Sequence, residues 1–154
     1  MDLSDDGMCF ACGPKNPIGL KLSFCFEDEK YVTRFTPRAE HQGFTGITHG
    51  GILATVLDEV MARLVYAKGI RAVTADMRIR LRKPAPRGEE LVISGWITSE
   101  ERRALECMAE ARNARGELVA EARARMVKVQ LKGARVCQTT LLRCTGPLMK
   151  LPRI

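Results

Sequence analysis

The chain has 154 residues, long enough for one domain with a substantial buried core. Its apolar content of 45% and charged content of 28% exclude a disordered chain, and no apolar run approaches the roughly 20 residues of a membrane-spanning helix. The net charge of +7 favours anionic partners, but only 5% of the residues are aromatic, too few for the stacking platform of a nucleic-acid groove. The acidic start MDLSDDGM has no apolar secretory segment. We therefore expect a cytoplasmic protein with no membrane and no nucleic-acid partner, whose ligand is a phosphate-bearing small molecule.

Residues 1–19 form a segment rich in Cys, Pro and Gly, and the chain has six cysteines in all. In a chain without a secretory signal these cysteines are expected to be free thiols. Cys9 and Cys12 have the spacing of half a zinc knuckle, but Cys137 and Cys144 are too far apart to complete one. We expect a tight turn with small buried thiols here, and no metal.

Six segments have the composition of β-strands, bounded by turn residues such as those in EDEK, PAPRGEE and NARGE. In the first segment, Leu20, Leu22, Phe24 and Phe26 alternate with smaller or polar residues, which is the period of a strand. Short turns between the later segments favour antiparallel pairing. The predicted strands are LKLSFCFE (20–27), YVTRFTP (31–37), AVTADMRIRLRKP (72–84), LVISGWITSE (91–100), ALECMAEARNA (104–114) and LVAEARARMVKVQL (118–131).

A Gly-dense loop before His49 leads into the one long helical pattern, residues 50–68, with Gly69 placed to end it. The order is then two strands, one helix and four strands, an α+β domain in which a helix packs on a six-stranded antiparallel sheet. This domain is expected to span residues 1–131. The basic residues 132–154 have no assigned structure.

Two adjacent acids, Asp58 and Glu59, lie in the middle of this helix, about 100° apart around its axis. Glu59 falls opposite the apolar face and four residues before Arg63, the favourable order for an ion pair. Asp58 falls at the margin of the apolar face, where a carboxylate is costly to bury without partners. Either it hydrogen-bonds a neighbouring strand for structural reasons or it has a catalytic role.

The helix begins with His49, Gly50 and Gly51. The first N–H groups of a helix lack internal partners and attract negative charge, and glycines let a ligand oxygen approach them closely. This start is suited to an oxyanion or phosphate, although His49 serves equally well as a helix cap. Gly50 and Asp58 are about 12 Å apart along a straight helix, so a single small reacting group cannot contact both in one chain. If they cooperate, one must come from a second copy packed antiparallel.

The motif THGGILATVLDE, with HQGFTG before it and CFACGPKNPIGL near the N-terminus, resembles the hotdog-fold acyl-CoA thioesterases of the phenylacetate-pathway (PaaI-like) type. The resemblance covers about residues 9–130, and the predicted order of strands and helix is also that of this family. It implies a homo-oligomer, a dimer or a dimer of dimers, that hydrolyses acyl-CoA to free acid and coenzyme A without a cofactor.

The resemblance also implies roles for individual residues. Gly50 offers its N–H to the thioester carbonyl beside His49, and Asp58 of the opposing subunit is the general base or nucleophile. Thr74 matches the hydroxyl residue that orients the attacking water. Gly51 is a substrate-binding candidate on the backbone argument above and not on the resemblance. Where some relatives have an Asn six residues before the His, this chain has Gly43, so the adjacent Gln42 is a candidate for the second carbonyl contact.

The segment MRIRLRKP alternates arginines with Ile79 and Leu81, so Arg78, Arg80 and Arg82 share one face. Most of these arginines are expected to belong to a solvated charge ladder with glutamates such as Glu106 and Glu110. Arg82 and Lys83, at the strand end, are the candidates for contacts to the coenzyme phosphates.

These features predict an acyl-CoA thioesterase. The alternative on the same fold is a non-catalytic acyl-CoA-binding sensor, against which the presence of both Asp58 and Thr74 argues. A basic nucleic-acid-binding module is a second alternative, and a hotdog dehydratase fits less well, because its catalytic acid and His are arranged differently.

Overall fold

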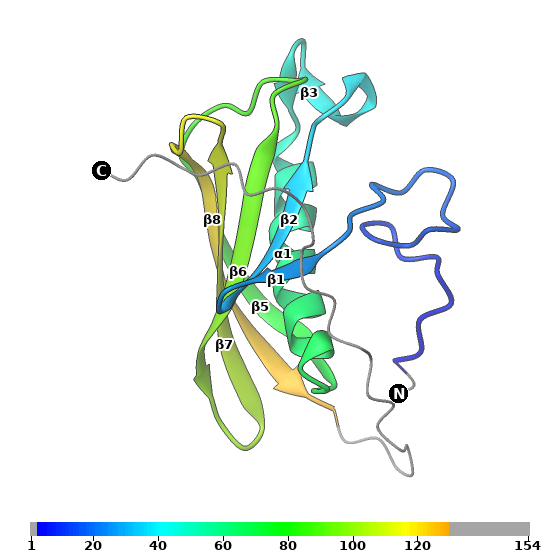
Figure 1. The fold of residues 1–154 in the computed structure, drawn as a ribbon, viewed down its shortest axis with the longest axis vertical. Helices are drawn as coiled ribbons and strands as arrows, with labels where there is room; N and C mark the ends of the chain where they lie inside the picture. The colour runs from blue at the N-terminus through cyan, green and yellow to red at the C-terminus, as the bar shows by residue number, and fades with distance from the viewer. Residues whose placement is uncertain (1–2, 130–154) are drawn as a thin grey trace.

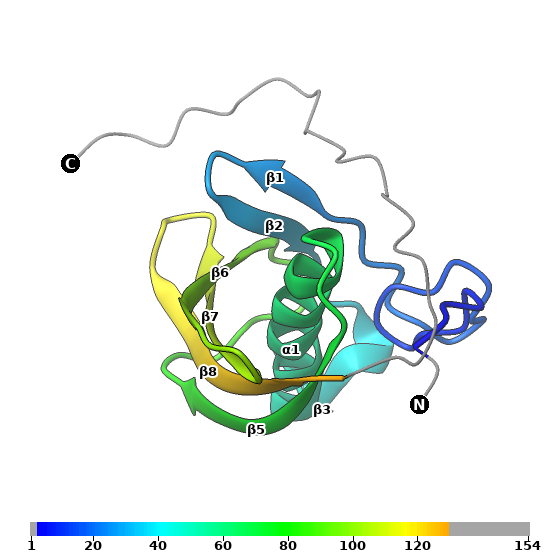
Figure 2. The same ribbon diagram turned by 90° about the horizontal axis from the view of Figure 1, so that it is seen from below.

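A computed structural model describes residues 3–129 of the chain. Six strands form one antiparallel sheet in the order β1-β2-β6-β7-β8-β5, and a single long helix, α1, packs on it. Seen along the helix, the sheet curls around α1 and leaves β1 and β5 as its two edges (Figures 1 and 2). The sheet strands and the helix are β1 (Cys25–Glu27), β2 (Lys30–Phe35), α1 (Gly50–Ala67), β5 (Ala72–Leu81), β6 (Leu91–Glu100), β7 (Ala104–Asn113) and β8 (Leu118–Lys128).

The core lies between one face of α1 and the inner face of the sheet. Leu57, Val60, Met61 and Leu64 are completely buried on the helix side. Opposite them, the central strands β7 and β8 present small residues, so the helix axis can approach the sheet closely. The contact is equally tight at Gly95 on β6, where an added Cβ would lie 3.2 Å from Val60 Cγ1. The buried alanines of β7 and β8 are Ala109, Ala111, Ala120, Ala122 and Ala124.

The C-terminal end of α1 is capped by local hydrogen bonds. Gly69 adopts a φ of +78°, its N–H donates to Tyr66 O, and the N–H of Ile70 donates to Val65 O. These two bonds form a Schellman motif, which a glycine at this position favours. The predicted end of the helix at Gly69 is therefore confirmed.

Within residues 3–129, no helix has the length and the apolar composition that are needed to cross a membrane.

The six predicted strands and the helix are all present, with two local differences. The first strand is shorter than predicted, because Lys21 has a φ of +57° and interrupts the extended run. Leu20 and Leu22 are nevertheless buried, and their N–H groups donate to Phe10 O and Ala11 O of the N-terminal segment. The predicted turn in EDEK is confirmed as a two-residue connection between β1 and β2.

The second difference lies in the Gly-dense loop before the helix. It contains a short 3-10 helix, η1 (Ala39–His41), and a small separate hairpin of β3 (Gln42–Phe44) and β4 (Ile47–Thr48). Strands this short carry no period from which they could be predicted. The basic residues predicted to follow the domain, 132–154, lie outside the described residues.

Candidate active site

His49 is the N-cap of α1. Its backbone is extended, and its Nδ1 accepts a 2.8 Å hydrogen bond from the N–H of Gly51. Because Nδ1 is the acceptor, the neutral ring carries its proton on Nε2, which leaves an outward-facing donor on an exposed side chain. The capping role that the sequence left open for His49 is thus present. It uses the Gly51 N–H, which is not free for a ligand in this arrangement.

The N–H of Gly50 behaves differently. Among residues 3–129 it has no hydrogen-bond acceptor, whereas the N–H groups of Ile52 and Leu53 both donate to His49 O. Gly50 also lines a cavity of about 260 Å³. A free N–H at the positive end of a helix and at the wall of a cavity can donate to an oxygen on which negative charge develops. The other lining residues are Ile47, Thr48, Leu53, Leu81, Arg82, Lys83, Pro84 and Ala85.

Arg82 and Lys83 reach the rim of this cavity from the connection that follows β5. Both are already paired within the chain. The guanidinium of Arg82 donates to Glu121 Oε1, at 2.5 Å from NH2, and Lys83 Nζ lies 2.7 Å from Glu117 Oε1. Roughly half of each basic side chain is still exposed. Arg82 and Lys83 are thus part of the charge ladder, with Glu121 and Glu117 as partners instead of the predicted Glu106 and Glu110, and a coenzyme phosphate would have to compete with these glutamates.

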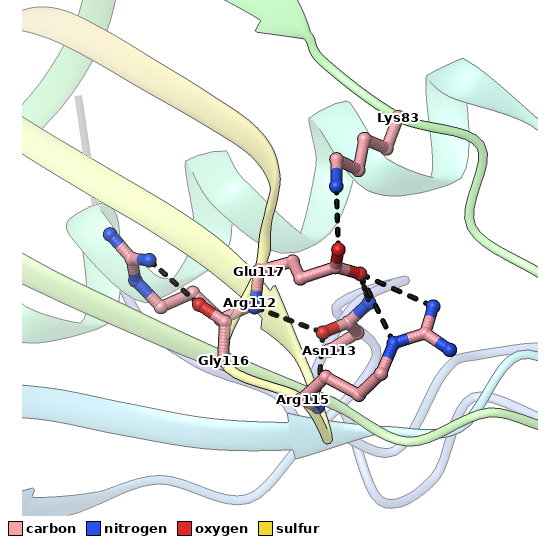
Figure 3. Close-up of polar contacts among 6 residues, drawn as sticks. All are labelled: Lys83, Arg112, Asn113, Arg115, Gly116 and Glu117. Atoms are coloured by element: carbon pink, nitrogen blue, oxygen red, sulfur yellow. Dashed lines mark hydrogen bonds and ion pairs between the residues drawn. The ribbon is translucent and has the colours of Figure 1, made fainter. Parts of the chain in front are cut away.

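Figure 3 shows why Glu117 is a strong partner. Its carboxylate accepts from Lys83, from Asn113 Nδ2 at 2.8 Å and from Arg115 Nε at 3.2 Å. These contacts lower the pKa of Glu117 to about 2, the hydrogen bond from Lys83 being the largest cause and that from Asn113 the next. The β7–β8 turn thus places a fixed negative charge beside Lys83.

Asp58 and Thr74 lie together, as the resemblance implied. Thr74 Oγ1 on β5 donates a 2.8 Å hydrogen bond to Asp58 Oδ1 on α1, and both side chains are half-buried. A β-bulge makes this contact possible. Thr74 is opposite Met126 and Asp76 is opposite Arg125, so Ala75 is the extra residue in β5. Thr74 therefore faces inward with Met126, whereas strict alternation would place it on the outer face with Arg78.

Gln42 and Gly43 lie beside the helix start. Gln42 Oε1 accepts from the N–H of Gly46 at 3.1 Å, a contact that closes the β3–β4 hairpin, and Gln42 does not line the cavity. A Cβ added at Gly43 would lie 3.1 Å from His49 Cδ2. The glycine thus leaves room for the His49 ring, and a larger residue there would require the ring to shift.

The predicted site residues consequently fall into two groups. Gly50, Arg82 and Lys83 line the cavity at the N-terminal end of α1, next to His49 and Gly51. Asp58 lies about two turns further along the helix, with Thr74 of β5 beside it, and both are outside this cavity. Asp58 is eight positions after Gly50 in one unbroken helix, which corresponds to a rise of about 12 Å.

The predicted partner of Glu59 is wrong. Arg63 instead pairs with Asp5 of the N-terminal segment, with Arg63 NH1 3.0 Å from Asp5 Oδ2. Glu59 Oε1 accepts from Cys9 Sγ at 3.5 Å. The helical spacing was correct, but the N-terminal segment covers this face of α1 and offers both side chains nearer partners (Figure 2).

Sequence reasoning missed Thr48, which lines the cavity one residue before the cap. Its Oγ1 is buried and has no hydrogen-bond partner within the described part of the chain. Unpaired buried hydroxyls are uncommon in folded proteins. The available signal was a threonine directly before His-Gly-Gly, at the end of a loop too short to show a period.

Comparisons with known proteins identify the family of the chain. A family model described as Thioesterase superfamily matches residues 45–120, which include the helix and Thr74. Acyl-coenzyme A thioesterase 13 of Homo sapiens is 31% identical over 97 residues, 61% of this chain and 69% of that protein.

Two solved structures share the fold. The PaaI protein of E. coli, from the phenylacetic acid degradation operon, superposes with a TM-score of 0.68 at 21% identity, over 72% of this chain and 81% of that one. A Streptococcus mutans protein bound to acetyl CoA gives a TM-score of 0.66 at 22% identity, over 70% and 88%. The hotdog architecture expected from the sequence is confirmed.

Proposed function

The chain belongs to the thioesterase superfamily and is a thioester hydrolase, and on that premise we propose that it hydrolyses an acyl-CoA to a free acid and coenzyme A. Two kinds of relative support this substrate class: the human relative is named an acyl-coenzyme A thioesterase, and the similar Streptococcus mutans structure holds acetyl CoA. The observation on which the proposal chiefly rests is the 2.8 Å contact between Thr74 and Asp58.

In the proposed reaction the thioester carbonyl oxygen accepts a hydrogen bond from the Gly50 N–H. As water attacks the carbonyl carbon, negative charge develops on that oxygen, and a fixed donor at a helix N-terminus stabilises it. The Nε2–H of His49 is a second donor near this position. Both groups are held by the backbone or by the cap, so they need little reorganisation during the reaction.

Asp58 acts on the water. As a general base it takes one proton while the water oxygen bonds to the carbonyl carbon; the tetrahedral intermediate then expels the coenzyme A thiolate, which recovers a proton. As a nucleophile, Asp58 would instead attack the carbonyl carbon and expel the coenzyme A thiolate, and water would hydrolyse the resulting mixed anhydride to the free acid and the Asp58 carboxylate. In either route Thr74 holds the carboxylate with its hydroxyl proton, and its oxygen lone pairs remain available to accept from the water.

The two halves of the site come from different subunits. Gly50 and Asp58 of one helix are too far apart to act on one carbonyl, so the Asp58–Thr74 pair of one copy must serve the Gly50 of another. A two-fold dimer would create two equivalent sites. The ten-residue edge strand β5, which carries Thr74, supports this arrangement because no strand among residues 3–129 pairs with its outer edge.

The coenzyme phosphates would bind Arg82 and Lys83 at the rim of the cavity, in competition with Glu121 and Glu117. The acyl group would enter the apolar part of the cavity near Leu53 and Leu81. Gln42 remains a candidate for a second carbonyl contact through its amide nitrogen.

The test is hydrolysis of a panel of acyl-CoAs by the wild-type chain and by Asp58→Asn. We expect turnover on at least one acyl-CoA and a loss of roughly 10²- to 10⁴-fold in kcat for the variant. Asp76→Asn is the matched control, since it removes an equal charge from the exposed outer face of the edge strand β5 and should leave kcat unchanged.

Two outcomes would contradict the proposal. Binding of acyl-CoA without turnover on any member of the panel would support the sensor instead. Equal activity of Asp58→Asn and the wild-type chain would exclude Asp58 as the base or nucleophile, while leaving hydrolysis itself intact.

A further inference from the structure

A group of metal-ligating side chains lies on the opposite side of α1 from the proposed chemistry. The Sγ atoms of Cys9 and Cys12 and a carboxylate oxygen of Glu59 all lie within 4.8 Å of one another. The three residues are half-buried, and the two cysteines pack against the core. They come from two elements far apart in sequence, the N-terminal segment and the middle of the helix.

The turn that carries the two cysteines is held by its own hydrogen bonds. The N–H of Gly13 donates to Cys9 O at 2.8 Å, which folds the five residues 9–13 into one tight turn, and the two sulfurs lie within 4.8 Å of each other. A Cβ at Gly13 would lie only 2.5 Å from Cys9 N and from Gly7 O. Lys21 Nζ donates to Gly13 O at 3.1 Å and so fixes the turn from outside. The sulfur positions are thus set by backbone geometry, before any ligand is considered.

The spacing of the three atoms suits a tetrahedral ion. With a zinc–sulfur bond of about 2.3 Å and a zinc–oxygen bond of about 2.0 Å, a sulfur and an oxygen at the tetrahedral angle are about 3.5 Å apart. The distance between Cys9 Sγ and Glu59 Oε1 is 3.5 Å. The side chains would therefore need little movement to share one ion.

The surrounding charge also suits a cation complex. Two thiolates and one carboxylate around a divalent ion have a net charge of −1, and Arg63 interacts electrostatically with both Cys12 and Glu59. A divalent cation between the sulfurs and the carboxylate would offset the repulsion of three negative groups held together in a half-buried place.

We propose that Cys9, Cys12 and Glu59 bind one Zn²⁺, with solvent in the fourth position. Two thiolates and a carboxylate in tetrahedral arrangement are a ligand set that zinc accepts. On binding, both thiols lose their protons to solvent. The ion ties the N-terminal segment to α1 at the residue next to Asp58, while Asp58 itself points to Thr74 on the other side. Its role is structural, and it takes no part in hydrolysis.

The test is to prepare the full chain with zinc and after chelation. We expect about one zinc per chain by elemental analysis, and thiolate-to-metal charge-transfer absorption when Co²⁺ is added to the chelated protein. Zinc should raise the Tm of the chelated chain by roughly 5–10 °C when free zinc is about a hundredfold above its Kd.

Cys9→Ser and Cys12→Ser should each abolish the Co²⁺ absorption and the zinc-dependent rise in Tm. Cys107→Ala is the matched control: this thiol is fully buried in the sheet, where its Sγ lies 3.9 Å from Met126 Sδ, and the variant should retain its zinc. Glu59→Gln keeps both sulfurs and the shape of the side chain, and should weaken zinc binding at least tenfold.

The proposal is overturned if the wild-type chain retains no zinc and shows no Co²⁺ absorption, or if Cys9→Ser and Cys12→Ser bind zinc as tightly as the wild-type chain does. Should a Ser variant not fold, unchanged zinc affinity in Glu59→Gln would contradict the ligand set by itself. Because metal content and Tm are measured without substrate, the result does not depend on thioesterase activity.

Discussion

At the scale of single residues, the hydroxyl of Thr74 is the most sharply testable group. Its hydrogen bond to Asp58 fixes the carboxylate, and a hydrogen bond to a charged group contributes about 1.5–3 kcal/mol. We expect Thr74→Val, which keeps the shape and removes the hydroxyl, to lower kcat/KM roughly 10- to 100-fold. Thr74→Ser should recover most of the activity because it restores the donor. Steady-state kinetics on the best acyl-CoA measures both, and a fully active Thr74→Val would remove Thr74 from the mechanism.

At the same scale the cysteines differ from expectation. Cys9, Cys12 and Cys107 are free, as predicted, but Cys25 is disulfide-bonded. Cys9 and Cys12 are also only half-buried, because they pack against the edge of the core while Ala11 between them is buried in it.

At the scale of elements, the β7–β8 turn makes a prediction about pH. The hydrogen bonds from Lys83 and Asn113 lower the pKa of Glu117 from 4.5 to about 2. A carboxylate with a lowered pKa stabilises the fold above its unfolded pKa, and this stabilisation is lost as the pH falls from about 4.5 toward 2. Glu117→Gln should therefore lower Tm by a few degrees at pH 6, and the difference from wild type should vanish near pH 2.

The comparison for this variant is Glu89→Gln, an exposed glutamate on the connection between β5 and β6. It should leave Tm unchanged across the same pH range in thermal melts followed by circular dichroism. A Tm difference for Glu117→Gln that is independent of pH would mean that the substitution acts through packing and not through charge.

At the scale of the whole molecule, the two-subunit site can be tested with a pair of inactive variants. Gly50→Pro removes the proposed donor at the first helical position, where proline is tolerated. Chains carrying it, mixed and refolded with Asp58→Asn chains, should regain about a quarter of the wild-type activity, because half of the dimers then contain one intact site of two.

Gly50→Ala is the control for the proline variant. Either residue adds a Cβ near Leu81 Cδ1, at 2.9 Å, but alanine keeps the N–H. We expect Gly50→Ala to retain most of its activity and Gly50→Pro to lose roughly 10²- to 10³-fold. No recovery in the mixture of Gly50→Pro and Asp58→Asn would place both groups in one subunit and contradict the proposed dimer site.

The fold was predictable from the sequence to the extent that its signals are local. Helical periodicity and the glycine after Lys68 located α1 within a residue, and strand alternation located five of the six strands closely. The first strand was overextended because one left-handed residue, Lys21, is invisible to a pattern of hydrophobicity. The β3–β4 hairpin was not predicted because its strands, of three and two residues, are too short to show an alternating pattern.

The candidate site was predictable only in part, for a related reason. The helical period alone shows that Asp58 places a carboxylate at the margin of the apolar face. Its association with Thr74 was predicted from the resemblance to the family. The partners of Glu59 and Arg63 depend on where the N-terminal segment lies against α1, and no periodicity of either segment specifies that. Likewise, the glutamates beside Arg82 and Lys83 come from β8 and from the β7–β8 turn, 39 and 34 residues later.

The bulge at Ala75 changes which residues of the edge strand β5 face the helix. Before the bulge the even-numbered Thr74 faces the helix. After the bulge the odd-numbered Met77 and Ile79 do, because they are opposite Ala124 and Ala122 on the buried face of β8. The same substitution therefore has opposite consequences on the two sides of Ala75: a charge at position 76 meets solvent, whereas a charge at position 74 enters the site. Any redesign of this strand has to count from the bulge, not from the end of the strand.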